Sequence, residues 1–513
     1  MASDLVVQFG NILNVPTIFP EEKGKVNVTV TNQGDTAFNG PVDLKLYAST
    51  DNQLDRNNLN TLGSPTGERG ANDPLRGTDE LLNTRQNNIS INNLAPGQSQ
   101  TITVDFAGAD FRTPSVVSPG AYYLFAEAQP SNNITDSNTS NNTSSQLVTQ
   151  GDVVIQWNSI LLNAIQATGK GDAKGTAPPI AARNQAIVHA AIYDAVNAID
   201  RASGGGHDPY RVNISASDAA GASKEAAAVE AAYRTLSELF PGQKAEFDAQ
   251  RTRSLAGIPD GAAKTKGLSV GQNVANQIIN LRRNDGTDRA GGGYTPGTDP
   301  GDFQIIPREL QPETRPRPEE PNNPALPRWG LVTPFAIRSV ADFRPEGPPE
   351  FSSPLYGREI ERVRQLGAKQ DTDVTKITRN ADQTEVAQFW AYDRDDTFRP
   401  PGQLNEVAQE ISLARNTSLS DNARLFALLN IAEADAGIVG WDAKYTYEQL
   451  RPITAIRNAD NDNNPQTKGD IALRKHARTM FECSIDTIAK AIKFIAPLPH
   501  PIFEYKPPML NLV

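Results

Sequence analysis

The hydrophobic pattern of this chain changes its period once, close to residue 150, and this change constrains the fold more than any other feature. Before it, apolar and polar residues alternate; after it, apolar residues recur at i, i+3 and i+4. Alternation places successive side chains on opposite faces of a strand, whereas the longer period lines one face of a helix. The sequence therefore predicts a β domain over residues 1–150, followed by an α-helical domain.

The first 150 residues consist of short alternating runs separated by turn residues. Asn-Gln-Gly, Pro-Gly and Asn-rich stretches stand between the runs, and these residues supply the backbone angles of tight turns. Frequent turns between alternating strands are typical of an antiparallel β-sandwich, in which one face of each strand is buried. The runs expected as strands are 25–31, 42–47, 101–106 and 121–127.

The run Leu-Tyr-Ala-Ser-Thr-Asp-Asn-Gln-Leu-Asp, residues 46–55, resembles bacterial CARDB-type immunoglobulin-like modules, which are related to cell adhesion. The resemblance implies an immunoglobulin-like sandwich that binds a surface or a partner, or that self-associates. Asp51, Asn52 and Asp55 carry the oxygen ligands that calcium prefers. The same residues also fit an Asx-rich turn between strands, and the sequence leaves both interpretations open.

Helical periodicity extends from residue 152 to 467 and predicts an all-α helical bundle. Pro178 and Pro179 stand where a helix can begin, because proline is tolerated in the first turn. A segment rich in Gly and Pro, 285–330, separates two helical blocks and is expected to be either a functional loop or a passive connector. The expected helices are 157–167, 180–200, 217–239, 243–255, 262–283, 356–366, 382–392, 404–415 and 421–457.

Composition excludes several classes of function. The net charge of −11 over 513 residues argues against non-specific nucleic-acid binding. The single cysteine excludes an intrachain disulfide and thiolate metal clusters, and no apolar run reaches the ~18–20 residues of a transmembrane helix. The N-terminus lacks the basic segment and apolar core of a secretory signal. Localisation therefore stays unknown, although an adhesion-like module without disulfides is compatible with an extracytoplasmic protein.

Residues 441–452, Trp-Asp-Ala-Lys-Tyr-Thr-Tyr-Glu-Gln-Leu-Arg-Pro, contain the residues best suited to chemistry. Lys444 and Arg451 are seven apart, close to two helical turns, so we expect both on one helix face together with Trp441. Arginine offers an oxyanion a planar fork, lysine offers it a point charge, and an apolar wall strengthens both. From the residues alone, a solvated basic face before a proline is the default explanation.

The surroundings of this segment resemble vanadium-dependent haloperoxidases and type-2 phosphatidic-acid phosphatases. Residues 434–452 are similar to the first oxyanion motif of this superfamily, an Ala-Asp-x-Gly helix followed by W-x-x-K-x6-R-P. Similar stretches precede it at 179–197, 294–301, 329–335 and 382–390, in the order found in the family. The resemblance implies that Lys444 and Arg451 hold vanadate as cofactor, or a substrate phosphate, and that Trp441 lines the halide side of the pocket. The implied substrates are peroxide and halide, or a small phosphate ester.

The resemblance ends before the family's remaining motifs, a Ser-Gly-His segment followed by a late Arg and a His. No Ser-Gly-His occurs in this sequence, and His500 is given no role because it precedes the aromatic residue that the motif histidine should follow. We expect His189 to be a packing histidine on an Ala-rich helix, and His207 and His476 to be solvated. No catalytic residue is therefore assigned, and no metal site other than vanadate.

Residues 468–513 differ in composition from the rest of the chain. Apart from Met1, the methionines and the cysteine all lie at 480 or beyond, and the segment carries seven Lys and Arg against four Asp and Glu. Because the resemblance also ends near 467, we predict a divergent basic tail, out of frame, on a haloperoxidase-like domain that is incomplete at its C-terminus. Helical periodicity over 471–495 equally allows a genuine helix that packs on the domain or lies on a partner.

Three functions remain open. The first is a haloperoxidase-like protein that is catalytically incomplete as this chain; the second is a phosphate-ester hydrolase of the same superfamily. The third is a non-catalytic adhesion or binding protein. The sequence decides neither whether the chain is an active enzyme, nor which halide or ester it prefers, nor its oligomeric state.

Overall fold

A computed structural model describes residues 2–473 except 15–22, 50–53, 55–58, 62–78, 82–86, 108–120, 131–135, 150, 170–174, 298–300, 305–324 and 394–396. The chain divides into two compact units, residues 1–281 with 393–426 and residues 282–392 with 427–513. Neither unit begins or ends at residue 150 or 467, so the domain boundaries expected there stay predictions. Asp51, Asn52 and Asp55 lie outside the described residues, as does the segment 474–513.

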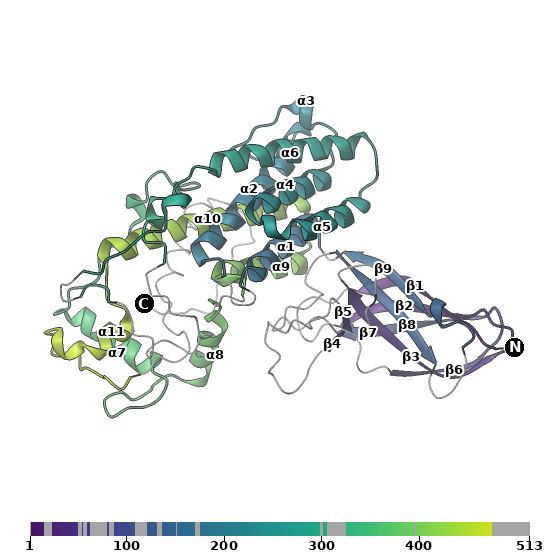
Figure 1. Cartoon of the computed structure of the whole chain (residues 1–513), viewed down its shortest axis with the longest axis horizontal. Coiled ribbons are helices and arrows are strands. Elements are labelled where there is room, and N and C mark those ends of the chain that lie inside the picture. The colour runs from purple at the N-terminus through teal and green to yellow at the C-terminus, as the bar shows by residue number, and fades with distance from the viewer. Residues whose placement is uncertain are drawn as a thin grey trace. The chain divides into compact units, whose positions relative to one another are not determined.

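The N-terminal part of the first unit is a pair of β-sheets (Figure 1). All described strand pairs are antiparallel except β4 with β5. The first sheet has the order β1 (Leu5–Asn14), β2 (Lys23–Asn32), β7 (Ser99–Ala107). The second has the order β4 (Leu59–Thr61), β5 (Asp79–Leu81), β3 (Phe38–Ser49), β8 (Ala121–Pro130), β9 (Thr143–Thr149), with β6 (Asn87–Leu94) also paired to β3.

Alternation along the strands explains why the two sheets pack face to face. On β2, Val26, Val28 and Val30 are fully buried and belong to one apolar core with residues of both sheets, Leu44 among them. The intervening β2 residues face outward, where Thr29 Oγ1 lies 2.9 Å from Oγ1 of its cross-strand neighbour on β7. Burying each such valine contributes about 1.5–3 kcal/mol. The predicted antiparallel sandwich is confirmed, and its four expected strands fall within β2, β3, β7 and β8.

The helical part of the first unit begins at α1, where Asp152 accepts the backbone N–H groups of Val154 and Ile155 as an N-cap. Helix α4 is rich in alanine and packs closely on α6. The helices are so close that a Cβ at Gly271 of α6 would collide with the Ala227 carbonyl of α4. As expected, Pro178 opens its helix. The helices are α1 (Val153–Ala167), α2 (Pro178–Ala202), α3 (Ala216–Ala219), α4 (Lys224–Leu239), α5 (Lys244–Ala256), α6 (Ala262–Arg282) and α9 (Arg399–Arg415).

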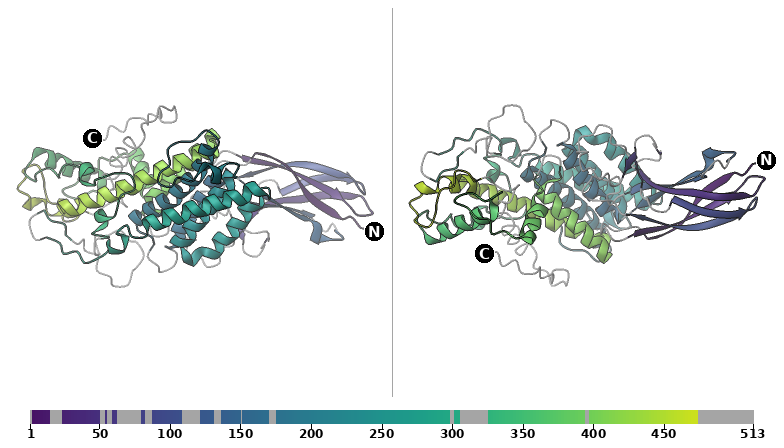
Figure 2. Two further views of the ribbon diagram at one scale, coloured as in Figure 1. Left: turned by 90° about the horizontal axis from the view of Figure 1, so that it is seen from above. Right: turned by 90° about the horizontal axis from the view of Figure 1, so that it is seen from below.

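The second unit is built around the C-terminal part of the longest described helix, α10 (Leu419–Tyr447), drawn in light green in Figure 2. Ser418 caps its start by accepting the Asp421 backbone N–H at 3.2 Å. The unit also contains α7 (Pro354–Gly367), α8 (Ala381–Trp390), α11 (Pro452–Arg457) and short 3-10 helices at Trp329–Leu331 and Ala341–Phe343.

Two segments that were each expected to form one helix form two helices in the structure. The expected helix 217–239 is divided by Gly221 at φ +72°, after which Ser223 caps α4. The expected helix 421–457 is wrong beyond Tyr447, because Glu448 has φ +48° and α11 starts only at Pro452. A residue that precedes proline is disfavoured in helical conformation, and Arg451 accordingly has ψ 143°.

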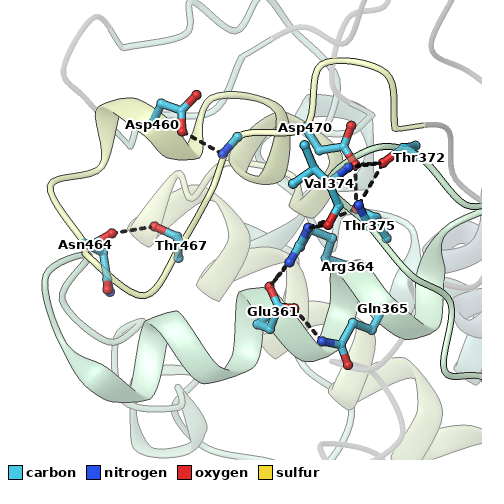
Figure 3. A network of polar contacts seen from close by, with 11 residues as sticks. Glu361, Arg364, Gln365, Thr372, Val374, Thr375, Asp460, Asn464, Thr467 and Asp470 are labelled. Carbon is cyan, nitrogen blue, oxygen red and sulfur yellow. Dashed lines mark hydrogen bonds and ion pairs between the residues drawn. The ribbon is translucent and has the colours of Figure 1, made fainter.

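Residues 460–473 fold back on α7 and on the loop that follows it (Figure 3). The Asp470 carboxylate accepts the hydroxyl hydrogens of Thr372, at 2.6 Å, and of Thr375, at 2.5 Å. Leu473 is fully buried beside Ile456 of α11. The described beginning of the predicted tail is therefore packed into the second unit, while its predicted foreign origin stays untested.

Candidate oxyanion site

Trp441 and Lys444 form the first half of the candidate site, near the C-terminal end of α10. The Lys444 Nζ atom lies 3.7 Å from the centroid of the Trp441 ring, which is a cation–π contact. The Trp441 indole N–H donates to the Ala325 carbonyl at 2.9 Å, so the orientation of the ring is fixed. Lys444 is an exposed residue, and its ammonium group lies over the half-buried, anchored ring of Trp441.

Arg451 forms the second half, but it does not lie on the same helix. It is the N-cap of α11, beyond the break after Tyr447, and its guanidinium carbon lies 5.9 Å from the centroid of the Phe303 ring. The expected single helix face is therefore wrong. An antiparallel bridge between Asp302 and Gln449 holds this loop, together with the Leu450 N–H, which donates to Gly301 O at 3.0 Å.

Aromatic rings connect the two halves. Tyr294 meets Phe303 edge to face at 6.0 Å between centroids and meets Tyr445 at 5.3 Å. The Tyr445 hydroxyl donates at 2.8 Å to the Ala325 carbonyl, the same oxygen that holds Trp441. Tyr294, Phe303, Trp441 and Tyr445 are called the aromatic cluster below. Lys444 and Arg451, though they lie on different elements, border one continuous aromatic cluster.

The electrostatics of the aromatic cluster favour neutral phenols beside the two cations. Burial raises the pKa of Tyr294 to about 12, and the carboxylate of Glu448 acts in the same direction. Burial also raises the pKa of Tyr445 to about 12, while the charge of Arg451 acts in the opposite direction. Both hydroxyls therefore stay protonated at neutral pH. An anion that approaches Lys444 and Arg451 therefore meets neutral aromatic rings rather than phenolate charge.

His189, the buried histidine among the described residues, takes no part in this site. His189 is fully buried, and its Nε2 lies 2.8 Å from Asn158 Oδ1. Asn158 Nδ2 donates to Gln409, so its Oδ1 accepts the histidine proton, and burial lowers the pKa of His189 to about 3. The predicted packing role of His189 is confirmed. His207 is exposed, as expected.

Two aspartates next to the motif helices have structural roles. Asp194 on α2 accepts the backbone N–H groups of residues 210–212, and Asp435 on α10 accepts those of residues 335–337. The hydrogen-bond partners of both carboxylates are thus backbone amides. Within the described part of the chain, no three His, Cys, Asp or Glu side chains come together as a metal site. The helices described also include none long and apolar enough to cross a membrane.

Sequence reasoning missed most of the side chains that surround Lys444. Tyr445 could have been found from the sequence, because it directly follows the lysine. In the structure it donates to the same carbonyl as Trp441. Tyr294 lies in a Gly- and Pro-rich segment that signals a loop and not a contact. The ion pair between Arg344 and Asp442 joins residues 98 apart, and no local pattern announces such a pair.

Comparison with known proteins gives related matches for the helical region. Residues 424–479 match a family model described as the VCPO second helical-bundle domain. Vanadium chloroperoxidase of Curvularia inaequalis is 26% identical over 350 residues, and the match covers 60% of this chain and 57% of that protein. The chain thus spans little more than half the length of this curated relative.

Two solved structures are also similar to parts of the chain. One is described as the first bacterial vanadium-dependent iodoperoxidase, with 20% identity, a TM-score of 0.46, and coverage of 62% of this chain and 74% of that one. The other is the CARDB domain of a Pyrococcus furiosus protein in complex with di-metal ions. It is 18% identical, with a TM-score of 0.17, and covers 29% of this chain and 93% of that one.

Proposed function

We propose, because this chain is a relative of the vanadium haloperoxidases, that Lys444 and Arg451 form an oxyanion-binding site of haloperoxidase type. The observation that supports the proposal is the position of Lys444, 3.7 Å above the Trp441 ring, on an aromatic cluster that also meets Arg451. This donor set fits a tetrahedral oxyanion: one ammonium and one planar guanidinium, both exposed, beside rings that reduce competition from water.

Each residue has a distinct part in binding. Lys444 supplies a point charge, and Arg451 supplies parallel N–H donors to two oxygens of the anion. Trp441, fixed by its bond to Ala325, keeps the ammonium in place and forms the wall against which halide would lie. When bound, vanadate would supply the centre that activates peroxide for halide oxidation. Among described residues, Arg451 forms no ion pair with a carboxylate, so its donors are available to an anion.

We propose further that these 513 residues bind the oxyanion without completing halide oxidation. The family's two catalytic histidines lie in the Ser-Gly-His motif and in the late Arg–His motif. This sequence lacks both motifs. His189 does not supply a substitute, because it is buried and neutral.

Calorimetric titration with orthovanadate tests the proposal. We expect the wild-type chain to bind, and Lys444→Ala and Arg451→Ala each to weaken binding about tenfold or more, since a charge-assisted hydrogen bond contributes about 1.5–3 kcal/mol. Arg358→Gln, which removes an exposed arginine on α7, is the matched control and should bind like the wild type.

Two activity assays separate the other functions. Bromide oxidation with peroxide should be absent in this chain, and turnover that depends on Lys444 would contradict the proposed incompleteness. Hydrolysis of p-nitrophenyl phosphate would favour the phosphate-ester hydrolase. A folded chain that binds neither vanadate nor phosphate would refute the oxyanion site and leave the adhesion or binding function.

A further inference from the structure

One segment of the second unit packs along α10 beside the candidate oxyanion site. Residues 325–347, called the strap below, contact α10 at Asp435, Trp441, Asp442, Tyr445 and Tyr447. Asp435, Trp441, Asp442 and Tyr445 fall within about one third of the helix circumference, and Tyr447 lies outside this sector in the last turn. The strap therefore covers α10 from the middle of its length to its last residue.

The middle of the strap lies directly on the helix backbone. A Cβ at Gly330 would stand 2.7 Å from the Asp442 Cα and 3.0 Å from its backbone nitrogen. Backbone atoms of a helix cannot move aside to remove such a clash, so only glycine fits here. Trp329, the preceding residue, is almost fully buried. The strap thus contacts the α10 backbone at the residue that follows Trp441.

A charged pair joins the strap to that same residue. The Arg344 guanidinium donates from Nε to Asp442 Oδ2 at 2.5 Å and from Nη2 to Oδ1 at 3.1 Å, which is the two-pronged geometry of an arginine–carboxylate fork. Asp442 stands between Trp441 and Lys444 in the sequence. Arg344 therefore fixes Asp442, which is one residue from Trp441 and two residues from Lys444.

The first residue of the strap holds the aromatic side of the site. Ala325 O accepts from the indole of Trp441 and from the hydroxyl of Tyr445. At the other end, the Tyr447 hydroxyl donates to Pro345 O at 2.7 Å, next to Arg344. Moving the strap along α10 would release the Trp441 ring, and with it the surface on which the Lys444 ammonium lies.

We propose that Arg344 is a positioning residue for the oxyanion site: its fork to Asp442 locks the strap on α10 and so sets the orientation of Trp441 and Lys444. The inference rests on the proposed oxyanion-binding function of Lys444 and Arg451. It adds a residue distant in sequence that touches neither the anion nor the two cations. The fork, and not only the charge, is required, because a lysine cannot make two parallel bonds to one carboxylate.

Three variants separate positioning from charge. Arg344→Gln removes the charge and the fork, and Arg344→Lys keeps the charge and removes the fork. Arg338→Gln removes an exposed arginine of the strap itself and serves as the matched control. Orthovanadate affinity is measured for each variant by calorimetry. We expect about a tenfold loss in Arg344→Gln, about a fivefold loss in Arg344→Lys and no loss in Arg338→Gln.

Trp441 fluorescence gives a second readout that does not depend on anion binding. The spectrum of each protein minus that of its Trp441→Phe counterpart isolates this indole from the other tryptophans. We expect this difference spectrum to shift to longer wavelength in Arg344→Gln and Arg344→Lys, because an indole released from Ala325 becomes more solvated. Arg338→Gln should reproduce the wild-type spectrum.

The two readouts distinguish the possible failures. Wild-type affinity in Arg344→Lys, or an unshifted Trp441 spectrum in both Arg344 variants, would overturn the positioning role. If the wild-type chain binds no vanadate, the proposed function fails, and the Trp441 spectra alone decide whether Arg344 positions the ring. If Arg344→Gln does not fold, Asp442→Asn replaces it, and an unshifted spectrum there overturns the inference in the same way.

Discussion

Glu406 and Glu410 show how burial changes the pKa of single side chains. They are one helical turn apart on α9, and burial raises the pKa of each from 4.5 to about 7. For Glu406, the neighbouring Glu410 carboxylate adds to the effect. Each side chain therefore binds its proton more tightly in the folded chain than in the unfolded chain, and its ionisation opposes folding.

This difference makes stability depend on pH in a specific window. Below about pH 4.5 both states are protonated and there is no penalty; as pH rises through 7 the folded chain loses stability. We expect Glu406→Gln to raise the free energy of unfolding by about 1–2 kcal/mol near pH 8, a value reduced for partial solvation, and to have little effect below about pH 5. Urea unfolding at both pH values measures the difference. A gain that is equal at both values would contradict the pKa assignment.

At the scale of elements, carboxylates capture loops on helices. Asp435 accepts three consecutive backbone N–H groups from the strap, at 2.6, 2.8 and 2.9 Å. Arg282 strengthens the same junction, because its guanidinium lies 3.8 Å from the Phe335 ring centroid and pairs with Asp285 at 2.9 Å. Burial raises the pKa of Asp435 above its ordinary value, and the amides and Arg282 counteract this effect.

Replacing Asp435 tests how much this junction contributes. Asp435→Asn presents one oxygen and one N–H₂ group to three amide donors, so at least one buried donor loses its acceptor. We expect a loss of about 2–4 kcal/mol in the free energy of unfolding. Asp373→Asn, at an exposed position of the same unit, should change it by less than about 0.5 kcal/mol. Equal small effects of both substitutions would show that the strap does not depend on Asp435.

The elements themselves were largely predictable, and their junctions were not. Alternation identified β2 and β3, and helical spacing identified most helices, because each pattern is local. The break after Tyr447 depends on Glu448 adopting φ +48°, on the bridge from Gln449 to Asp302 and on Pro452. Only the proline is visible in the local pattern, so a continuous helix was expected.

The candidate site was predictable to the same extent. Trp441, Lys444 and Arg451 were identified from a motif and its resemblance to a family. Their arrangement was not, because the aromatic cluster and the Arg344–Asp442 fork bring together residues far apart in sequence. Contacts of this kind depend on tertiary packing, and neither periodicity nor spacing encodes them.

At the scale of the whole molecule, a β-sandwich precedes a helical region that is similar to vanadium haloperoxidases. The family-model match over residues 424–479 extends past the boundary expected at 467. The structure accordingly packs Asp470 and Leu473 into the second unit (Figure 3). The account of function rests on one claim, that Lys444 and Arg451 hold an oxyanion beside the aromatic cluster.

A crystal structure of the chain soaked in orthovanadate tests this claim most directly. The account predicts a tetrahedral oxyanion within about 3 Å of the Lys444 ammonium and the Arg451 guanidinium, with Trp441 still bonded to Ala325. An oxyanion bound at another site, or none at a concentration that saturates calorimetric binding, would contradict it.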